Sequence, residues 1–319
     1  MSDLIDGVLK RNELTVSAAG GTELVALRLS KAIREEYLKG VQIIFSRVRE
    51  IQSDKKVIFY CHDLPHDSES ARLADPTFRK MLSKIVFVSQ WQAEAYRNTF
   101  GLSYDEYVVI PNPIEPIRFV EKPTTGPIKM IYHTTPHRGL ELLIPAFEAL
   151  AERFDVELDV FSSFKIYGWE QRDKMYENLF EACRAHPKIH YHGFQPNDVI
   201  RKALETTHIF AYPNIWPETS CLAMIEALAS GCNVVHPNHA ALPETACNLT
   251  TMFQMSNQKH VIANQTLKHT VELVKLWQQN PLAMNESGKY RSRFINDIHD
   301  IQDIALIWES LLRDIKQPK

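Results

Sequence analysis

The sequence lacks the cysteine pattern of a disulfide-stabilised protein. Its five cysteines are scattered, and none forms a Cys-x-x-Cys pair. Because secreted disulfide scaffolds use even numbers of cysteines at regular spacings, this usage favours a reducing compartment. The first residues do not resemble a secretory leader, and no apolar run is long enough to span a membrane. We therefore expect a cytoplasmic protein whose contact with membranes is at most peripheral.

Excess charge and a dinucleotide-binding glycine pattern are also missing. The formal net charge is −3, which does not favour nucleic acid as a partner. No Gly-x-Gly-x-x-Gly follows a predicted strand, and this argues against an NAD-dependent oxidoreductase. The 319 residues are 45% hydrophobic and 24% charged, as expected for a globular protein of roughly two domains.

Apolar runs alternate with helical patterns in both halves of the chain, which is typical of α/β proteins with mostly parallel sheets. Residues 112–127 contain several prolines and no periodicity, so we interpret them as an interdomain connector. We predict a first domain over residues 1–115 and a second over residues 116–299. Helical spacing in the last part of the chain predicts a long helix from about Asn285 to Ile315.

Two predicted strands of the first domain are followed by small or polar residues. Leu14–Ser17 precedes Gly20 and Gly21, and a helix is predicted from Leu24 to Leu38. Val57–Tyr60 precedes His62 and Asp63. Ligands of open α/β folds bind at the carboxyl ends of strands, so both loops are candidate binding elements. The alternative for His62 is that it pairs with Asp63 and only caps a turn.

The most informative stretch is Ile209–Gly231, which predicts a buried strand, a polar loop and a helix that ends at the glycine. Glu218 lies in the loop. If the helix begins near Thr219, Glu226 lies about two turns further along on the same face. Free N–H groups at the start of that helix would bind an anion. The alternative is a core strand and helix with two solvated glutamates.

Several motifs resemble those of glycosyltransferase family 4, a group of retaining enzymes that use nucleotide sugars. The resemblance extends over most of the chain and depends on the order and spacing of the motifs. These are Gly20–Glu23 (GGTE), the loop at His62, Val86–Gln92 (VFVSQWQ), Val108–Ile114 (VVIPNPI), Arg138–Leu140 (RGL), His192–Phe194 (HGF), the Glu218/Glu226 pair and Glu226–Val235 (EALASGCNVV).

This resemblance implies a GT-B fold, in which two Rossmann-like domains face each other across a cleft. The C-terminal helix would cross back, so that residues of about 300–319 complete the first domain. It also implies transfer of a sugar from a nucleotide-sugar donor to a hydroxyl of a glycan, lipid-linked or other acceptor, with retention of anomeric configuration. No metal and no cofactor are expected, because cationic side chains and helix N-termini would hold the diphosphate.

The resemblance also assigns the diphosphate contacts. Arg138 would be the main cation, at a position where the family usually has lysine. The family's second cation, an arginine about five residues upstream, corresponds to His133 here, and Lys165 or Arg172 would have to replace its charge. Backbone N–H groups at the start of the second-domain helix would complete the contacts, and their residues are Thr219, Ser220, Cys221 and Leu222.

The remaining roles concern the nucleoside, the transferred sugar and the first domain. Glu226 would bind the ribose hydroxyls, and Glu218 would face the transferred sugar. Gly193 and Phe194 would lie beside the base. In the first domain, Gly20 and Gly21 would approach the phosphates, and His62 would reach the sugar from the acceptor side. The catalytic set implied in this way consists of Glu218, His62 and Arg138.

Other classes of function remain open at this point. One is an epimerase that acts on nucleotide sugars within the same fold, and another is a non-catalytic protein that binds a nucleotide sugar or a glycan. Thirteen histidines also permit a metal site at His190 and His192, near His236 and His239. No cysteine or carboxylate is positioned by the sequence as a third ligand, so we do not predict one.

Overall fold

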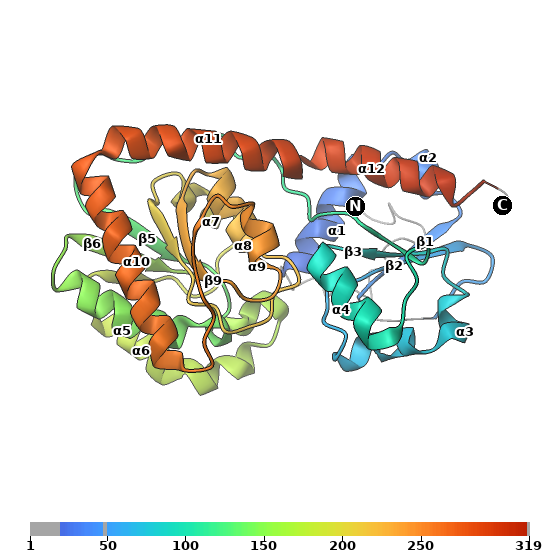
Figure 1. Cartoon of the computed structure of the whole chain (residues 1–319), viewed down its shortest axis with the longest axis horizontal. Coiled ribbons are helices and arrows are strands. Elements are labelled where there is room, and N and C mark those ends of the chain that lie inside the picture. The colour runs from blue at the N-terminus through green and yellow to red at the C-terminus, as the bar shows by residue number, and fades with distance from the viewer. Residues whose placement is uncertain (1–19, 47–49, 318–319) are drawn as a thin grey trace. The chain divides into compact units, whose positions relative to one another are not determined.

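The computed structural model describes residues 20–46 and 50–317. The chain divides into two compact units, one formed by residues up to Glu115 and from Ile298 onward, the other by Pro116–Asp297. Each unit contains one parallel sheet with flanking helices (Figure 1). This architecture confirms the predicted α/β fold class. The strand predicted at Leu14–Ser17 lies outside the described residues.

The sheet of the N-terminal unit has the order β1-β2-β3-β4, with all neighbours parallel. Its strands β1, β2 and β3 are almost entirely buried, as expected for strands made of continuous apolar runs. The elements of this unit are α1 (Gly21–Ala32), α2 (Glu35–Leu38), β1 (Val41–Phe45), β2 (Lys56–Tyr60), η1 (Ser68–Ala74), α3 (Pro76–Arg79), β3 (Lys84–Phe87), α4 (Gln90–Phe100), β4 (Tyr107–Val109) and α12 (Ile301–Asp314).

The helix α4 begins as the sequence predicts, with Ser89 as its cap. The Ser89 hydroxyl accepts a hydrogen bond from the Gln92 N–H at 3.0 Å. The Gln92 side chain in turn accepts from the Val88 N–H at 2.9 Å and donates to the Asp63 carbonyl at 2.8 Å. Both the oxygen and the nitrogen of the Gln92 carboxamide are therefore used, and α4 is tied to the loop that follows β2.

The long C-terminal pattern is not one helix, as predicted from its spacing, but two. α11 ends at His299, and α12 begins at Ile301 with Asp300 as its N-cap. The break arises because the backbone around Asp300 bonds to another segment: the Ile114 N–H donates to the His299 carbonyl at 2.8 Å, and the Ile301 N–H donates to the Ile114 carbonyl at 3.0 Å.

α12 packs against α1 and α2 of the N-terminal unit, which confirms the predicted return of the C-terminal helix (Figure 1). Trp308 is fully buried and meets the ring of Tyr60 edge-on, with centroids 4.9 Å apart. Glu309 accepts hydrogen bonds from the guanidinium and the backbone N–H of Arg34. The second of these bonds explains why the single helix predicted over Leu24–Leu38 is instead interrupted between α1 and α2.

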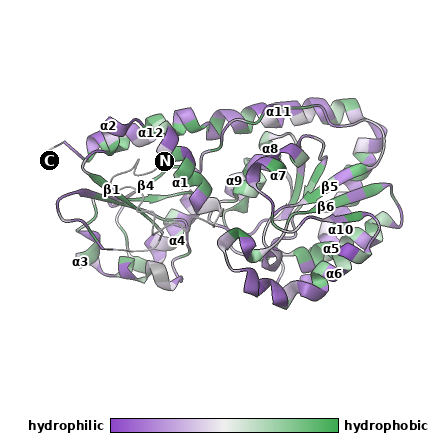
Figure 2. Ribbon diagram, turned by 180° about the vertical axis from the view of Figure 1, so that it is seen from behind, coloured by the Kyte–Doolittle hydropathy of each residue, from purple (hydrophilic) through white to green (hydrophobic). Residues whose placement is uncertain are grey.

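The sheet of the C-terminal unit has the order β10-β9-β8-β5-β6-β7, again all parallel. Figure 2 shows β5 and β6 coloured mostly as hydrophobic. The elements are β5 (Ile128–Tyr132), η2 (Pro136–Arg138), α5 (Leu140–Ala151), β6 (Val156–Val160), η3 (Phe164–Tyr167), η4 (Glu170–Tyr176), α6 (Glu177–Ala185), β7 (Ile189–Tyr191), α7 (Asn197–Leu204), β8 (Ile209–Ala211), α8 (Leu222–Ala229), β9 (Asn233–Pro237), α9 (Leu242–Ala246), β10 (Thr251–Phe253), α10 (Lys259–Gln279) and α11 (Pro281–His299).

This strand order is that of a Rossmann fold, in which the chain builds outward from β5 to β7 and then returns to place β8 on the other side of β5. Among its α-helices and strands, α9 and β10 were not predicted from the sequence. Both are short, and the three residues of β10 lie at the edge of the sheet with Met252 exposed. A three-residue edge strand carries too little alternation to be recognised.

The end of α8 is fixed by two glycines that let backbones meet. Gly231 has φ 86°, and the N–H groups of Gly231 and Cys232 donate to the carbonyls of Leu228 and Ala227, as in a Schellman motif. A Cβ on Gly231 would lie 2.6 Å from the ring of Phe119 and 3.0 Å from the carbonyl oxygen of Gly288 in α11. The predicted glycine C-cap is confirmed.

The connector before β5 is held by a buried lysine. The Lys122 side chain is 2% exposed, and its ammonium donates to the carbonyl of Leu204 at 2.6 Å and to that of Glu205 at 3.2 Å. These carbonyls end α7, so the positive charge lies at the negative end of the helix dipole. Burial lowers the pKa of Lys122. The connector is thus fastened to the C-terminal unit.

We expect Gly231→Ala to destabilise the C-terminal unit more than Gly126→Ala. Both glycines have similar backbone angles, with φ 86° and 83°, but an added Cβ at Gly126 meets nothing within 4 Å. The left-handed conformation alone costs about 1–2 kcal/mol, and the clash with Phe119 and Gly288 adds about 1–3 kcal/mol. Denaturant unfolding of the two variants measures the difference, and equal losses of stability would contradict the proposed backbone contact.

Candidate functional site

The predicted site residues of the C-terminal unit follow two strands that lie side by side. β5 pairs with β8, although β6 and β7 separate them in the sequence. The order of the sheet therefore reverses between β5 and β8. The loops that follow these strands meet at a topological switch point, where open α/β folds bind their ligands.

The two loops are in direct backbone contact at Gly139. This glycine has φ 129°, and a Cβ placed on it would lie 2.1 Å from the carbonyl oxygen of Pro213. The neighbouring Ile215 N–H donates to the Arg138 carbonyl at 3.2 Å. Only glycine permits this approach, which positions Arg138 beside the loop that carries Glu218.

Arg138 and Glu218, which the sequence assigns to one site, form an ion pair. A guanidinium Nη1–H of Arg138 donates to Oε1 of Glu218, and Nη2 donates to the hydroxyl of Tyr167 at 3.4 Å. The Tyr212 hydroxyl donates to the same Oε1 at 2.5 Å. The Glu218 side chain is 5% exposed and that of Arg138 is 20% exposed. The pair therefore lies at the inner edge of the site and is partly open to solvent.

The charges of this group follow from their surroundings. Burial lowers the pKa of Arg138, but the adjacent Glu218 carboxylate outweighs it and the pKa is raised above the usual value. Burial and the same carboxylate raise the pKa of Tyr212. Arg138 is thus a permanent cation and Tyr212 a permanent hydrogen-bond donor.

The loop between Tyr212 and Glu218 is locked by a side chain that the sequence analysis missed. Asn214 is fully buried, and its Oδ1 accepts from the Trp216 N–H at 2.8 Å while its Nδ2 donates to the Trp216 carbonyl at 2.7 Å. On the far side, the Ala241 N–H donates to the Glu218 carbonyl at 3.1 Å. An asparagine directly after a proline is typical of such a turn, and this was the available signal.

The helix after this loop begins later than predicted. α8 starts at Leu222, and the preceding residues Thr219 to Cys221 are not helical. The Glu218 carbonyl, which would accept the first bond of a helix that began near Thr219, accepts from the Ala241 N–H instead. The predicted start near Thr219, on which the placement of Glu226 two turns further along the same face depended, is wrong, whereas Glu218 lies in the loop as predicted. Cys221 is the N-cap, with no side-chain hydrogen bond to the helix start.

Glu226 forms a second cluster with the loop after β7. It is 3% exposed, and its Oε2 accepts from the Nδ2 of Asn197, the first residue of α7, at 2.8 Å. The loop just before α7 contains Gly193 and Phe194, and Gly193 has φ 63°. Asn197 therefore ties Glu226 to the start of α7, directly after the loop that contains Gly193 and Phe194. The idea of a solvated Glu226 is wrong.

His133, at the position of the family's second cation, is uncharged. It is 8% exposed beside the ring of Phe210, whose centroid lies 4.7 Å from its own. Burial lowers the pKa of His133 to about 3. Its Nε2, Thr135 Oγ1 and Ser162 Oγ are buried and have no hydrogen-bond partner among the described residues. These three atoms are at the carboxyl ends of β5 and β6.

The two cations considered as replacements for the missing charge contact neighbouring side chains. Arg172 lies over the ring of Trp169, 4.3 Å from its centroid, and Lys165 pairs with Glu170 at 3.6 Å. Close to Arg138, the ring of His137 stacks on Phe164 at 5.2 Å. Burial first, and then Arg138 and Arg172, lower the pKa of His137 to about 4.

The predicted residues of the N-terminal unit are Gly20, Gly21 and His62. Gly20 is the N-cap of α1 with φ −69°, a value open to any residue. The His62 N–H donates to the Ser46 hydroxyl at 3.0 Å, and its ring lies 4.3 Å from that of Tyr60. Burial lowers the pKa of His62 to about 3, so its imidazole is neutral at pH 7.

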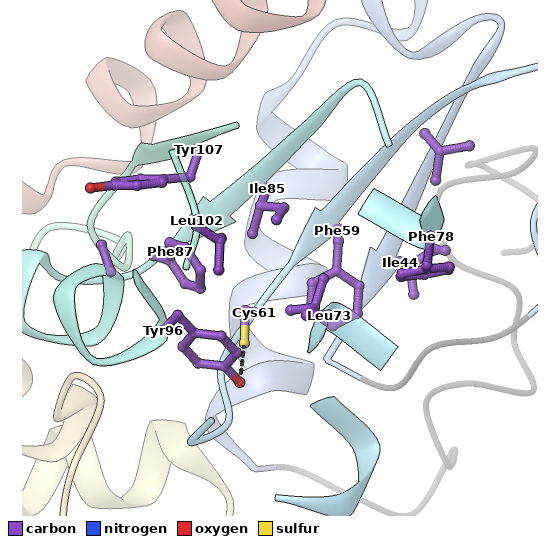
Figure 3. Packing of buried hydrophobic residues seen from close by; sticks show 12 residues of the cluster. Ile44, Phe59, Cys61, Leu73, Phe78, Ile85, Phe87, Tyr96, Leu102 and Tyr107 are labelled. Carbon is purple, nitrogen blue, oxygen red and sulfur yellow. Dashed lines mark hydrogen bonds between the residues drawn. The ribbon is translucent and has the colours of Figure 1, made fainter. Parts of the chain in front are cut away.

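The loop that carries His62 rests on a buried polar network. The thiol of Cys61 lies 3.0 Å from the Tyr96 hydroxyl (Figure 3). That hydroxyl is also 2.6 Å from the Ser70 Oγ, and 3.2 Å from the Asp63 carbonyl. Gln92 donates to the same carbonyl, as described above. α4 therefore positions the residues after β2 through side chains that are inside the core.

Within the residues described, no three His, Cys, Asp or Glu side chains are grouped so that they could hold a metal ion. His192 instead pairs with Asp159 at 2.7 Å and stacks on Phe161, and His236 contacts the Thr250 hydroxyl at 2.8 Å. The same residues include no helix that is both long and apolar enough to cross a membrane.

Comparison with known families identifies the class of protein. Residues 115–297 match the family model of glycosyl transferases group 1. The chain therefore belongs to this family. No curated protein sequence matches the chain.

Solved structures with the same fold are glycosyltransferases of low sequence identity. HepE from Anabaena, in complex with UDP-glucose, is 15% identical with a TM-score of 0.64, over 91% of this chain and 82% of that one. A glycosyltransferase from Rickettsia africae ESF-5 is 16% identical with a TM-score of 0.62, over 94% and 82%. TarM of S. aureus is 15% identical with a TM-score of 0.62, over 90% of this chain.

The chain spans 58% of the length of TarM. The likeness to these structures is a likeness of fold. Together with the two parallel sheets, it confirms the predicted GT-B fold.

We expect the stability of the protein to fall in acid, in part because of His133. Its pKa is about 3 in the folded chain and about 6.5 when unfolded. Between these values the unfolded state binds one more proton, so stability decreases by up to about 1.4 kcal/mol per pH unit as the pH falls. His133→Gln should reduce this slope. Denaturant unfolding at pH 7, 6, 5 and 4 measures it, and equal slopes in both proteins would contradict a buried neutral imidazole.

Proposed function

We propose that the chain is a retaining glycosyltransferase of family 4 that moves a sugar from a nucleotide-sugar donor to an acceptor hydroxyl. The observation that carries this proposal is the pair Arg138–Glu218 at the switch point of the C-terminal sheet. It combines one fixed cation and one carboxylate at the place where a Rossmann fold binds phosphate and sugar. Membership of glycosyl transferases group 1 supports the same conclusion.

The diphosphate of the donor would bind at Arg138 and at the N–H groups before and at the start of α8. These groups belong to Thr219, Ser220, Cys221 and Leu222. A helix N-terminus and a guanidinium both favour a dianion. His133 is neutral and would contribute a hydrogen bond rather than a charge. The site therefore relies on Arg138 more than on any other side chain.

The nucleoside would bind near Glu226. Its carboxylate can accept both hydroxyls of a ribose diol, and Asn197 fixes its orientation. Gly193 and Phe194, in the loop before Asn197, would lie beside the base. HepE of Anabaena was solved with UDP-glucose, and a pneumococcal neighbour named as an O-GlcNAc transferase was solved with UDP and GlcNAc. We therefore propose a UDP-sugar as the first donor to test.

In the reaction, the bond between the anomeric carbon and the diphosphate oxygen breaks as the anomeric carbon gains positive charge. Arg138 and the α8 N-terminus stabilise the departing negative charge. The acceptor oxygen forms its bond on the same face, and its proton passes to the leaving diphosphate. Glu218 would bind hydroxyls of the transferred sugar. This route needs no protein base at the reacting oxygen, and no metal.

We propose that the N-terminal unit supplies the acceptor side. His62 would hydrogen-bond to the transferred sugar as a neutral imidazole, and Gly20 and Gly21 would offer N–H groups at the start of α1. The acceptor would be a hydroxyl of a glycan, a lipid-linked molecule or another compound. We place the reaction in the cytoplasm, with membrane contact at most peripheral. The net charge of −3 gives no reason to expect a nucleic acid partner.

We expect one class of nucleotide sugar among UDP-, GDP- and ADP-sugars to raise the melting temperature, and Arg138→Ala to abolish the shift. Loss of this cation should also lower kcat by about 10²–10³. Arg184→Ala is the matched control, since Arg184 is exposed on α6 and pairs with Glu177. This control should keep the shift. If no nucleotide sugar changes the melting temperature of the wild type, the donor site is wrongly assigned.

We also expect the product to keep the anomeric configuration of the donor and the activity to persist in excess EDTA. NMR of the newly formed glycosidic bond determines the configuration, and a chelator titration tests the metal. An inverted product would exclude the proposed same-face route, and loss of activity that Mg²⁺ restores would exclude metal independence. An isomerised nucleotide sugar formed without acceptor would instead indicate an epimerase.

A further inference from the structure

Glu218 has two partners at a single oxygen. Its Oε1 accepts from the Arg138 guanidinium and from the Tyr212 hydroxyl at 2.5 Å. Tyr212 is fully buried directly after β8, and its ring stacks on Phe210 with centroids 5.0 Å apart. The tyrosine is thus fixed by packing, whereas the Arg138 side chain is 20% exposed and has more freedom to move.

The guanidinium of Arg138 also has one donor that neither Glu218 nor Tyr167 uses. Nε of Arg138 is buried and has no hydrogen-bond partner among the described residues. A bound diphosphate would interact with the same positive charge that the Glu218 carboxylate already contacts. Two anions on one cation repel each other, so they compete for it.

We propose that Glu218 and the donor diphosphate compete for Arg138, and that Tyr212 is a positioning residue that holds Glu218 when Arg138 turns to the diphosphate. This inference rests on the proposed function. It goes further by giving Tyr212 a role and by predicting how the affinity for a nucleoside diphosphate changes. Tyr212 does not touch the substrate in this proposal and acts through Glu218.

The first consequence is that changing a site residue should increase the affinity for a nucleoside diphosphate. Glu218→Gln removes the competing charge, so the nucleoside diphosphate should bind about tenfold more tightly although a site residue is lost. Glu226→Gln is the matched control, since it makes the same change on the other glutamate. It should weaken binding instead, because Glu226 contacts the nucleoside in the proposed site.

The second consequence is a coupling between Tyr212 and Glu218. Without the hydroxyl, Glu218 relies on Arg138 alone, so Tyr212→Phe should weaken diphosphate binding severalfold. In the Glu218→Gln background the same change should have no effect, because the competition is already removed. Tyr132→Phe is the control, since this buried tyrosine of β5 donates to the Thr135 carbonyl at 3.0 Å. Its effect should be the same in both backgrounds.

The experiment is isothermal titration of UDP, GDP and ADP into the wild type, the single variants and the two double variants. Circular dichroism confirms that each variant is folded. If Glu218→Gln does not fold, Tyr212→Phe alone still tests whether Glu218 competes with the diphosphate for Arg138. Tighter binding by Glu218→Gln, or weaker binding by Tyr212→Phe alone if only that variant folds, supports the proposal. Unchanged or weaker binding by folded Glu218→Gln, or an equal effect of Tyr212→Phe in both backgrounds, overturns it.

The outcome separates this inference from the proposed function. If the wild type binds a diphosphate and Arg138→Ala abolishes binding, the donor site stands whatever Glu218→Gln does. If neither the wild type nor any variant binds a diphosphate, the proposed function and this inference both fall. A steady-state assay adds a further readout: Tyr212→Phe should lower kcat about tenfold, as expected for a carboxylate that is no longer held in place.

Discussion

The backbone contact between Gly139 and Pro213 sets how close the two strand-end loops of the C-terminal sheet can lie. A Cβ at Gly139 would be 2.1 Å from the Pro213 carbonyl oxygen, so the chain can be this compact only with glycine there. The contact exists because the order of the sheet reverses between β5 and β8. The Arg138–Glu218 pair, and the site built around it, depend on this packing of main chain against main chain.

Much of the fold follows from local patterns in the sequence. Val41–Phe45 and Ile128–Tyr132 are the strands β1 and β5 with the predicted bounds. A short apolar run between turn residues is typical of a buried strand. Ser89 caps the start of α4 and Gly231 follows the end of α8, as expected, since capping depends on a few neighbouring residues. Loops placed directly after strands also made Arg138 and Glu218 visible as candidates.

What the sequence did not show depends on residues far apart in the chain. The late start of α8 follows from the bond between Glu218 and Ala241, and the break at Asp300 follows from pairing with Ile114. Neither partner lies within the window from which a helix is predicted. The neutral state of His133 follows from burial, and Tyr212 looked like the last residue of an apolar strand. Tertiary contacts determine such features, and these contacts cannot be predicted from local sequence patterns.

The place of α12 has a consequence for how the protein forms in the cell. In the N-terminal unit Trp308 packs on Tyr60, so one packing partner of its sheet follows the whole C-terminal unit in the sequence. The C-terminal unit is continuous in sequence from Pro116 to Asp297. During synthesis, all residues of the C-terminal unit are therefore made before α12, which the N-terminal unit needs to complete its packing. We therefore expect the C-terminal unit to complete its fold before the N-terminal unit, the reverse of the usual order of co-translational folding.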